Sequence, residues 1–382
     1  MGSLLNFVFL SDKLEKNGSS EYAIAGPLFW YMQEKPFSYT LNGEIKQGYK
    51  NLLLIEASHG LSSFEKLPDE IINFILNNDV RLFAVSIADP SSKYGYDSCI
   101  SFLNEKIPNK FYTMDSNSAL NTSFTLDYFL EEATYKDTER NGIFNVHTSL
   151  GYVSEKIYED EINNFREKKF LSFNRTNDKH HRAGLLHEYL TNDYSDSYFS
   201  FLGKIEQLGD IPYVGDIRDN RDFYNSKLPI ELDTQNLVDK TSFSTSSALK
   251  KELFLNSCIH IVSETSFVNN ELFVSEKVLK PILMYQPFIV IGPMGYLKYI
   301  NEKYGFKTFS TFWDESYDEI EDYKDRLKSV LELIRELNKK SIEEFNEIYQ
   351  KTKNICIYNR NLFSSLELDS IPQIFKKIED EW

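Results

Sequence analysis

Ser275, Glu276 and Lys277 place a hydroxyl, an acid and a base side by side at the start of an expected helix. A structural explanation is available, because serine caps helices, a first-turn glutamate suits the helix dipole, and Lys280 can pair with Glu276 at the surface. The functional explanation is a phosphate site, because free N–H groups at a helix start and the Lys277 ammonium both attract anions. Pro281 costs about 3 kcal/mol inside a regular helix, which favours the functional explanation.

The segment SFNRTNDKHHRAGLLHEYL, residues 172–190, is a second candidate, because an expected strand ends there and a helix follows. Arg175 comes directly after the strand-end Asn174, and Arg182 opens the helix. Guanidinium groups present paired donors to phosphate oxygens, and parallel sheets bind ligands at the carboxyl ends of their strands. The alternative is a basic loop that balances an acidic protein.

Three side chains in the first part of the chain could act as a general base. Asp12, His59 and Asp89 each end an expected strand. Deprotonating an acceptor hydroxyl needs a group with a tunable pKa at the ligand edge of a sheet. Polar residues also cap turns at strand ends, so each residue has a structural alternative.

Two successive β-α alternations must position these groups. Near-continuous apolar runs typical of buried parallel strands cover 6–12, 51–60, 80–89 and 110–116, then 168–176, 198–205, 259–265, 287–292 and 306–309. Helical spacing covers 62–79, 181–192, 250–258, 295–305 and most of the chain from 317 onward. The pattern predicts an α/β protein with two facing Rossmann-like domains and a helical C-terminal tail.

The expected domains follow these alternations. Residues 1–165 form an acceptor-side domain, and residues 166–345 form a nucleotide-binding domain. Residues 346–382 form C-terminal helices that can pack back on the first domain.

The net charge and the cysteine content argue against nucleic-acid partners, disulfides and a zinc site. The net charge of −16 argues against nucleic acid, because affinity for its backbone comes from Lys and Arg neutralising phosphates. The three cysteines are widely spaced without a CxxC pair, so we expect neither disulfides nor a zinc site. No stretch approaches the roughly 18–20 apolar residues of a membrane span. We expect a soluble, cytoplasmic protein.

The segment IVSETSFVNNELFVSEKVLKPILMYQPFIVIGPMGYLKYI, residues 261–300, resembles the donor-binding segment of the alpha-1,3-fucosyltransferase-like glycosyltransferases. In that family a strand Glu is followed by Thr-Glu-Lys at a helix start, matched here by Glu264 and by Ser275-Glu276-Lys277. GFKTFSTFWDESYDEIEDYKDRL is similar to a stretch of viral and bacterial sequences assigned as glycosyltransferases. FLSFNRTNDKHHR is similar to the strand and loop that carry the donor-phosphate arginine.

The resemblance implies a GT-B fold and transfer of a sugar from a UDP- or GDP-type donor to a hydroxyl, with inversion and without a metal or other cofactor. Lys277 and Arg175 would hold the diphosphate and Glu276 the ribose, with Arg182, Asn174 and Ser275 in the same donor site. Glu264 would lie beside the donor sugar or support the site. The acceptor is a glycan, a protein or a small molecule, and the compartment is the host cytoplasm if the protein is viral.

Two alternatives stay open. A sugar-nucleotide-modifying enzyme needs a Gly-rich phosphate loop after its first strand, and LSDKLEKNGSSEY supplies no such pattern. A non-catalytic nucleotide- or glycan-binding protein predicts binding without transfer.

Overall fold

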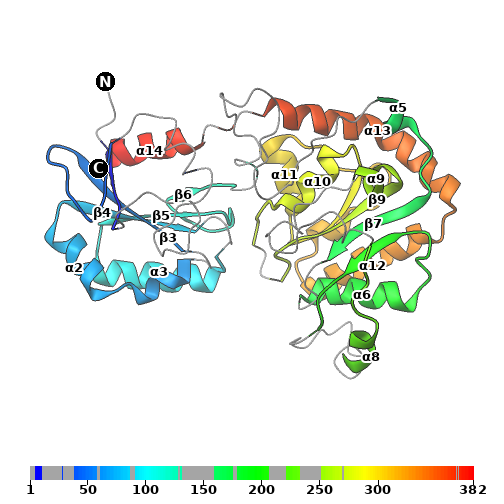
Figure 1. The fold of residues 1–382 in the computed structure, drawn as a ribbon, viewed down its shortest axis with the longest axis horizontal. Helices are drawn as coiled ribbons and strands as arrows, with labels where there is room; N and C mark the ends of the chain where they lie inside the picture. Colours follow the sequence, from blue (N-terminus) through cyan, green and yellow to red (C-terminus); the bar gives the residue numbers. More distant parts are fainter. Residues whose placement is uncertain are drawn as a thin grey trace. The chain divides into compact units, whose positions relative to one another are not determined.

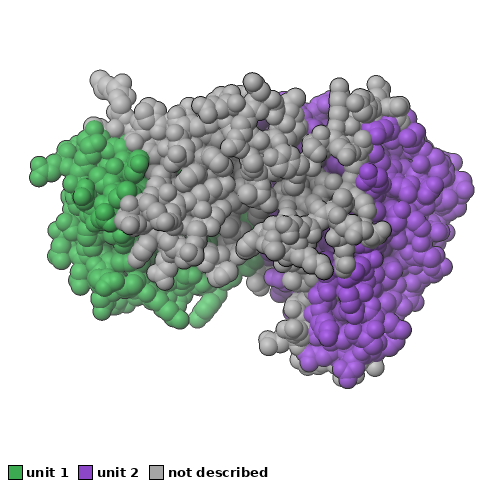
Figure 2. All heavy atoms as spheres, in the orientation of Figure 1, with its two compact units in different colours: residues 1–135, 271–273, 367–382 green, residues 136–270, 274–366 purple. Residues whose placement is uncertain are grey.

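The chain forms two compact units (Figure 2). The computed structural model describes residues 5–10, 28, 38–57, 61–86, 91–127, 130, 159–174, 179–205, 221–232, 251–268, 271–366, 368 and 370–382. Unit 1 comprises Met1–Tyr135, Glu271–Phe273 and Glu367–Trp382, and unit 2 comprises Lys136–Asn270 and Val274–Leu366. The short segment Glu271–Phe273 therefore joins unit 1, although the chain on both sides of it belongs to unit 2.

Unit 1 is built on a six-stranded sheet of order β2-β1-β3-β4-β5-β6, in which every pair is parallel. Its strands are β1 (Leu5–Val8), β2 (Ser38–Thr40), β3 (Lys50–Glu56), β4 (Val80–Ser86), β5 (Phe111–Asp115) and β6 (Phe124–Thr125). Its helices are the 3-10 helix η1 (Leu61–Lys66), α2 (Asp69–Asn77), α3 (Lys93–Lys106) and α14 (Ser370–Glu381). The helices lie on both sides of the sheet, with α14 opposite α2 and α3 (Figure 1).

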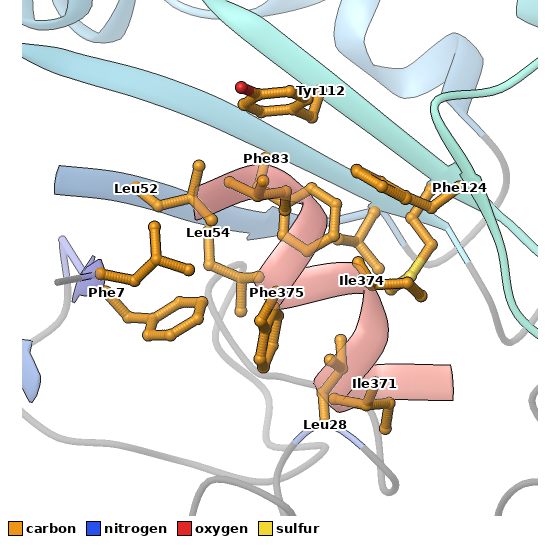
Figure 3. Packing of buried hydrophobic residues seen from close by; sticks show 14 of the residues in the cluster. Phe7, Leu28, Leu52, Leu54, Phe83, Tyr112, Phe124, Ile371, Ile374 and Phe375 are labelled. Carbon is orange, nitrogen blue, oxygen red and sulfur yellow. The ribbon is translucent and has the colours of Figure 1, made fainter. Parts of the chain in front are cut away.

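Alternation along the strands of unit 1 sends apolar side chains to two separate clusters. Leu53 and Ile55 of β3 pack with residues of α2 and α3, whereas Leu52 and Leu54 pack with residues of α14. The α14 side of the core is formed by Ile371, Ile374, Phe375 and Ile378, whose spacing marks one helical face (Figure 3). The ring of Phe375 lies 4.8 Å from that of Phe7, so the end of the chain completes the core begun by the first strand.

Unit 2 is built on a four-stranded parallel sheet of order β10-β9-β7-β8. Its strands are β7 (Lys168–Asn174), β8 (Tyr198–Phe201), β9 (Ser257–Ser263) and β10 (Phe288–Ile291). Its helices are α5 (Glu159–Asn163), α6 (His180–Thr191), α8 (Arg221–Ser226), α9 (Lys251–Leu255), α10 (Glu276–Leu283), α11 (Tyr296–Tyr304), η4 (Ser316–Glu319), α12 (Tyr323–Asn338) and α13 (Ile342–Ser365). Helix α6 packs on α12, and α13 contacts α10, β7 and β9.

The prediction of an α/β protein with parallel sheets and C-terminal helices is confirmed. Of the expected tail, α13 belongs to unit 2 and α14 to unit 1. None of the helices within the described ranges is long and apolar enough to cross a lipid bilayer.

The strand predicted at 306–309 is wrong. Gly305 ends α11 in the left-handed conformation, with φ 81°, and residues 306–309 continue as irregular chain. Phe306 and Phe309 are buried, and Phe309 stacks on Trp313. These two apolar residues, three positions apart, thus anchor a loop instead of lining a sheet face.

Helix α3 was not expected from the sequence. It buries only Gly95, Cys99 and Leu103, which are spaced four residues apart. This stripe is too narrow to give a clear helical period, because a core-facing helix usually repeats apolar residues at three- and four-residue intervals.

Candidate functional site

Glu264 lies directly after β9 and joins the starts of two helices. Its Oε2 accepts hydrogen bonds from Ser275 Oγ at 2.5 Å and from the Thr265 N–H at 3.2 Å. Its Oε1 accepts a hydrogen bond from the Tyr296 hydroxyl at 2.6 Å. Ser275 is the N-cap of α10, and Tyr296 is the first residue of α11. The carboxyl group is 1% exposed, so it holds these elements together inside the protein.

Burial raises the pKa of Glu264, although Lys277 and the hydroxyl donors of Ser275 and Tyr296 act in the opposite direction. The charged form is therefore less favoured than for a glutamate in water.

The start of α6 reaches the backbone of the same residue. His181 Nε2–H donates to the Glu264 carbonyl oxygen at 2.8 Å. Arg182 Nη2 donates to the carbonyl oxygens of Glu264 at 3.2 Å and Ser263 at 3.4 Å. Burial lowers the pKa of Arg182, while Glu264 and Glu276 favour its charged form. Burial also lowers the pKa of His181 well below its usual value, so this ring is neutral near pH 7.

Lys277 is the accessible cation at the start of α10. Its Nζ lies 3.0 Å from Glu276 Oε1, 2.9 Å from Thr265 Oγ1 and 3.5 Å from Ser275 Oγ. The side chain of Lys277 is 25% exposed, against 8% for Glu276. Lys277 is therefore the more exposed member of the pair, and Glu276 Oε1 contacts its ammonium.

Glu276 and Lys280 are both buried, so the solvated surface pair considered from the sequence is wrong. Burial acts to raise the pKa of Glu276, but Lys277 and Lys280 outweigh it, and the net pKa is lowered. Burial lowers the pKa of Lys280 to about 8 against the attraction of Glu276. The start of α10 thus carries an ionised carboxylate between two lysines.

Five of the residues predicted for the donor site lie in this cluster: Arg182, Glu264, Ser275, Glu276 and Lys277. Asn174 is buried at the end of β7, at the same edge of the sheet. We call the ends of β7 and β9, formed by Asn174, Ser263 and Glu264, the carboxyl edge of unit 2. The other predicted residues, Arg175, Asp12, His59 and Asp89, lie outside the described residues.

Tyr296 was not identified from the sequence as a contact of this site, whereas His181 lies in the segment 172–190 that the sequence singles out. Tyr296 follows Glu264 by 32 residues, and His181 precedes it by 83. Both become neighbours only through the order of the strands.

Unit 1 has a strand-end carboxyl group that the sequence analysis missed. Asp115 is the last residue of β5 and is fully buried. It accepts hydrogen bonds from the Asn117 N–H at 2.7 Å, the Ser91 N–H at 3.2 Å and the Ser91 hydroxyl. Burial, with a smaller contribution from Glu271, raises its pKa to about 6 despite these donors. The signal was available, because Asp115 lies at the end of the strand predicted at 110–116, as Asp12 and Asp89 lie at the ends of theirs in the sequence-based prediction.

In the part of the chain that the structure describes, no cluster of His, Cys, Asp and Glu is arranged to hold a metal ion. Comparisons of the sequence with protein-family models and with curated proteins gave no match.

Proposed function

We propose that this protein is a glycosyltransferase that moves a sugar from a nucleoside diphosphate sugar to an acceptor hydroxyl. The observation that supports it is the convergence of Arg182, Lys277 and the starts of α6 and α10 on the carboxyl edge of unit 2. Ligands of open parallel sheets bind at such an edge, and helix starts and cations together suit phosphate groups.

The chemistry follows from charge. Breaking the bond between sugar and diphosphate leaves negative charge on the diphosphate, and fixed cations stabilise that charge best when they are positioned beforehand. Arg182 is held by two backbone carbonyl groups, and Lys277 by Glu276 and Thr265. These cations supply the positive charge that a bound metal supplies in other transferases, so sugar transfer should persist in the presence of a chelator.

The acceptor hydroxyl needs a base on the opposite face of the sugar, which gives inversion at the anomeric carbon. The candidates are Asp12, His59 and Asp89, which the sequence predicts at strand ends, and Asp115, whose pKa is raised by burial. Under this proposal the fold is of the GT-B type.

The test is a calorimetric and thermal-shift titration of the full chain with UDP, GDP, CMP, dTDP and their sugar conjugates. A nucleoside diphosphate that binds should raise the melting temperature with concentration. The protein should hydrolyse the sugar conjugate slowly in the presence of EDTA. It should consume the conjugate faster when an acceptor hydroxyl is present to receive the sugar. Binding without any turnover of the sugar conjugate would make the chain a nucleotide-binding protein. Absence of binding to every nucleotide would refute the proposal.

A further inference from the structure

Asn174 carries a buried acceptor oxygen whose orientation is fixed by its neighbours. Its Nδ2 lies 3.2 Å from Ser172 Oγ, and Ser172 Oγ donates its own hydrogen to the Ile261 carbonyl oxygen at 3.0 Å. Ser172 must then accept from the amide, so Nδ2 faces Ser172 and Oδ1 points elsewhere. Oδ1 is closed to solvent and has no hydrogen-bond partner among the described residues.

Ser263, on the neighbouring strand β9, carries a second buried polar atom of this kind. Its Oγ is also closed to solvent and has no partner in the described part of the chain. In the pairing of β7 with β9, Lys168 is opposite Ser257 and Leu171 is opposite His260. The same offset places Asn174 opposite Ser263, and paired residues of parallel strands share a face of the sheet.

Two buried polar atoms, Asn174 Oδ1 and Ser263 Oγ, therefore lie on one face at the carboxyl edge of unit 2 with no partner among the described residues. Arg182 Nη2 lies 3.4 Å from the Ser263 carbonyl oxygen, and Glu264 is the next residue. Buried polar groups in native proteins nearly always have a partner, so an unpaired neighbouring pair at a ligand edge points to a missing ligand group.

The missing group must donate a hydrogen bond. An amide oxygen can only accept, so ionised phosphate oxygens, which also only accept, cannot pair with Asn174 Oδ1. Hydroxyl and N–H groups can, and a nucleoside offers both on its ribose and its base.

We propose that Asn174 and Ser263 form the nucleoside subsite of the donor, with Asn174 Oδ1 accepting from a ribose hydroxyl or a base N–H. This inference rests on the proposed function and divides the edge into two parts. Lys277 and Arg182 take the diphosphate, and Asn174 with Ser263 takes the nucleoside.

The subsite predicts different effects on stability and on binding. Asn174→Leu keeps the side-chain size and removes the unpaired acceptor together with the Nδ2 bond to Ser172, so the ligand-free protein should melt close to the wild-type temperature. Its affinity for UDP or GDP, whichever the wild type binds, should fall about five- to ten-fold. Its affinity for inorganic diphosphate should not change. Ser263→Ala should give the same pattern with a smaller loss.

Ser257→Ala is the matched control, because Ser257 is a buried serine at the amino end of the same strand. Its Oγ pairs with Gln286 Nε2 at 2.7 Å, so this variant should melt lower and keep its nucleotide affinity. A 2′,3′-dideoxynucleoside diphosphate locates the donor group. If the Asn174→Leu penalty vanishes with this probe the partner is a ribose hydroxyl, and if it persists the partner is the base.

Unchanged nucleotide affinity in Asn174→Leu would overturn this inference and leave the proposed function intact. Equal losses for nucleotide and inorganic diphosphate, or a lowered melting temperature with losses for both, would also overturn it. Failure of the wild type to bind any nucleotide would overturn both proposals.

Discussion

The two sheets end in buried carboxyl groups with different surroundings. Asp115 of unit 1 takes its hydrogen bonds from Ser91 and Asn117 in the adjoining loops, and the charged group acting on its pKa is another acid, Glu271. Glu264 of unit 2 takes its hydrogen bonds from the starts of α10 and α11, and the charged groups that act on its pKa include Lys277.

Under the proposed function, the difference gives the two edges separate chemical roles. Burial raises the pKa of both groups, but Asp115 has no cation among the causes of its shift. An acid beside an acid is suited to taking up a proton near neutral pH. A carboxyl group among cations and helix starts is suited to holding a binding site for an anion in shape.

The largest effect should come from Glu264→Ala. It leaves the Ser275 and Tyr296 hydroxyls and the Thr265 N–H without their acceptor, and we expect a loss of about 3 kcal/mol or more in the unfolding free energy of unit 2. Hydrogen exchange of β9 amides reports this unit separately. Glu302→Ala on α11, whose side chain is 66% exposed, is the control and should cause no measurable change. Equal exchange rates in both variants would contradict the role of Glu264.

The next effect should be a pH dependence in unit 1. The folded protein holds the pKa of Asp115 at about 6, above its usual value of 3.8, so between these values the unfolded state has already lost the proton that the folded state keeps. Stability from this group is therefore present below about pH 4 and is lost as pH rises through 6. The loss amounts to about 3 kcal/mol.

Asp115→Asn removes this titration. The difference in unfolding free energy between wild type and Asp115→Asn, measured in urea at pH 4, 5, 6 and 7, should change across the range in favour of the variant. A constant difference would mean that Asp115 has an ordinary pKa. Nucleotide affinity should be the same in both proteins, because the anion site belongs to unit 2.

Lys277→Ala should weaken nucleoside diphosphate binding about 30-fold, equivalent to about 2 kcal/mol, because a charge-assisted contact to phosphate is lost. Calorimetry with the nucleotide that binds the wild type gives the value. Lys298→Ala, an exposed lysine on α11, is the control for loss of net charge and should bind as the wild type does. Similar losses of nucleotide affinity in the two variants would mean that binding depends on the net charge of the protein and not on Lys277 in particular.

The smallest effect should come from Tyr296→Phe. It removes only the hydroxyl that donates to Glu264 Oε1, at a cost of about 1.5 kcal/mol in the stability of unit 2. Tyr299→Phe, whose hydroxyl meets the exposed Lys303, should leave the stability of unit 2 unchanged. If Tyr296→Phe is equally harmless, Glu264 does not depend on α11 for its position.

The fold could be predicted from the sequence more fully than the candidate site. Continuous apolar runs such as those of β4 and β9 identify parallel strands, because both faces are covered. The start of α10 was also predictable, since Ser275 is an N-cap followed by an acid. The sequence left open whether the helices of 346–382 pack on the first domain, because the core that α14 completes in unit 1 is formed by residues far apart in the chain.

Within the site, residue type alone pointed to Lys277 and Arg182 but not to their surroundings. Glu276 and Lys280 are buried, so they do not form the solvated surface pair that their spacing suggests. Their burial follows from the packing of α10 on α13, β9 and β10. Asp115 follows the same strand-end pattern in the sequence as Asp12 and Asp89, but its raised pKa appears only once its burial is known.

Hydrogen exchange with and without nucleotide tests most directly the claim that the carboxyl edge of unit 2 binds a nucleoside diphosphate. With UDP or GDP added to saturation, amides in the first turns of α6 and α10 should exchange more slowly, and amides of 111–117 around Asp115 should not change. Slower exchange around Asp115 alone, or no change at α10 with millimolar nucleotide, would contradict the account.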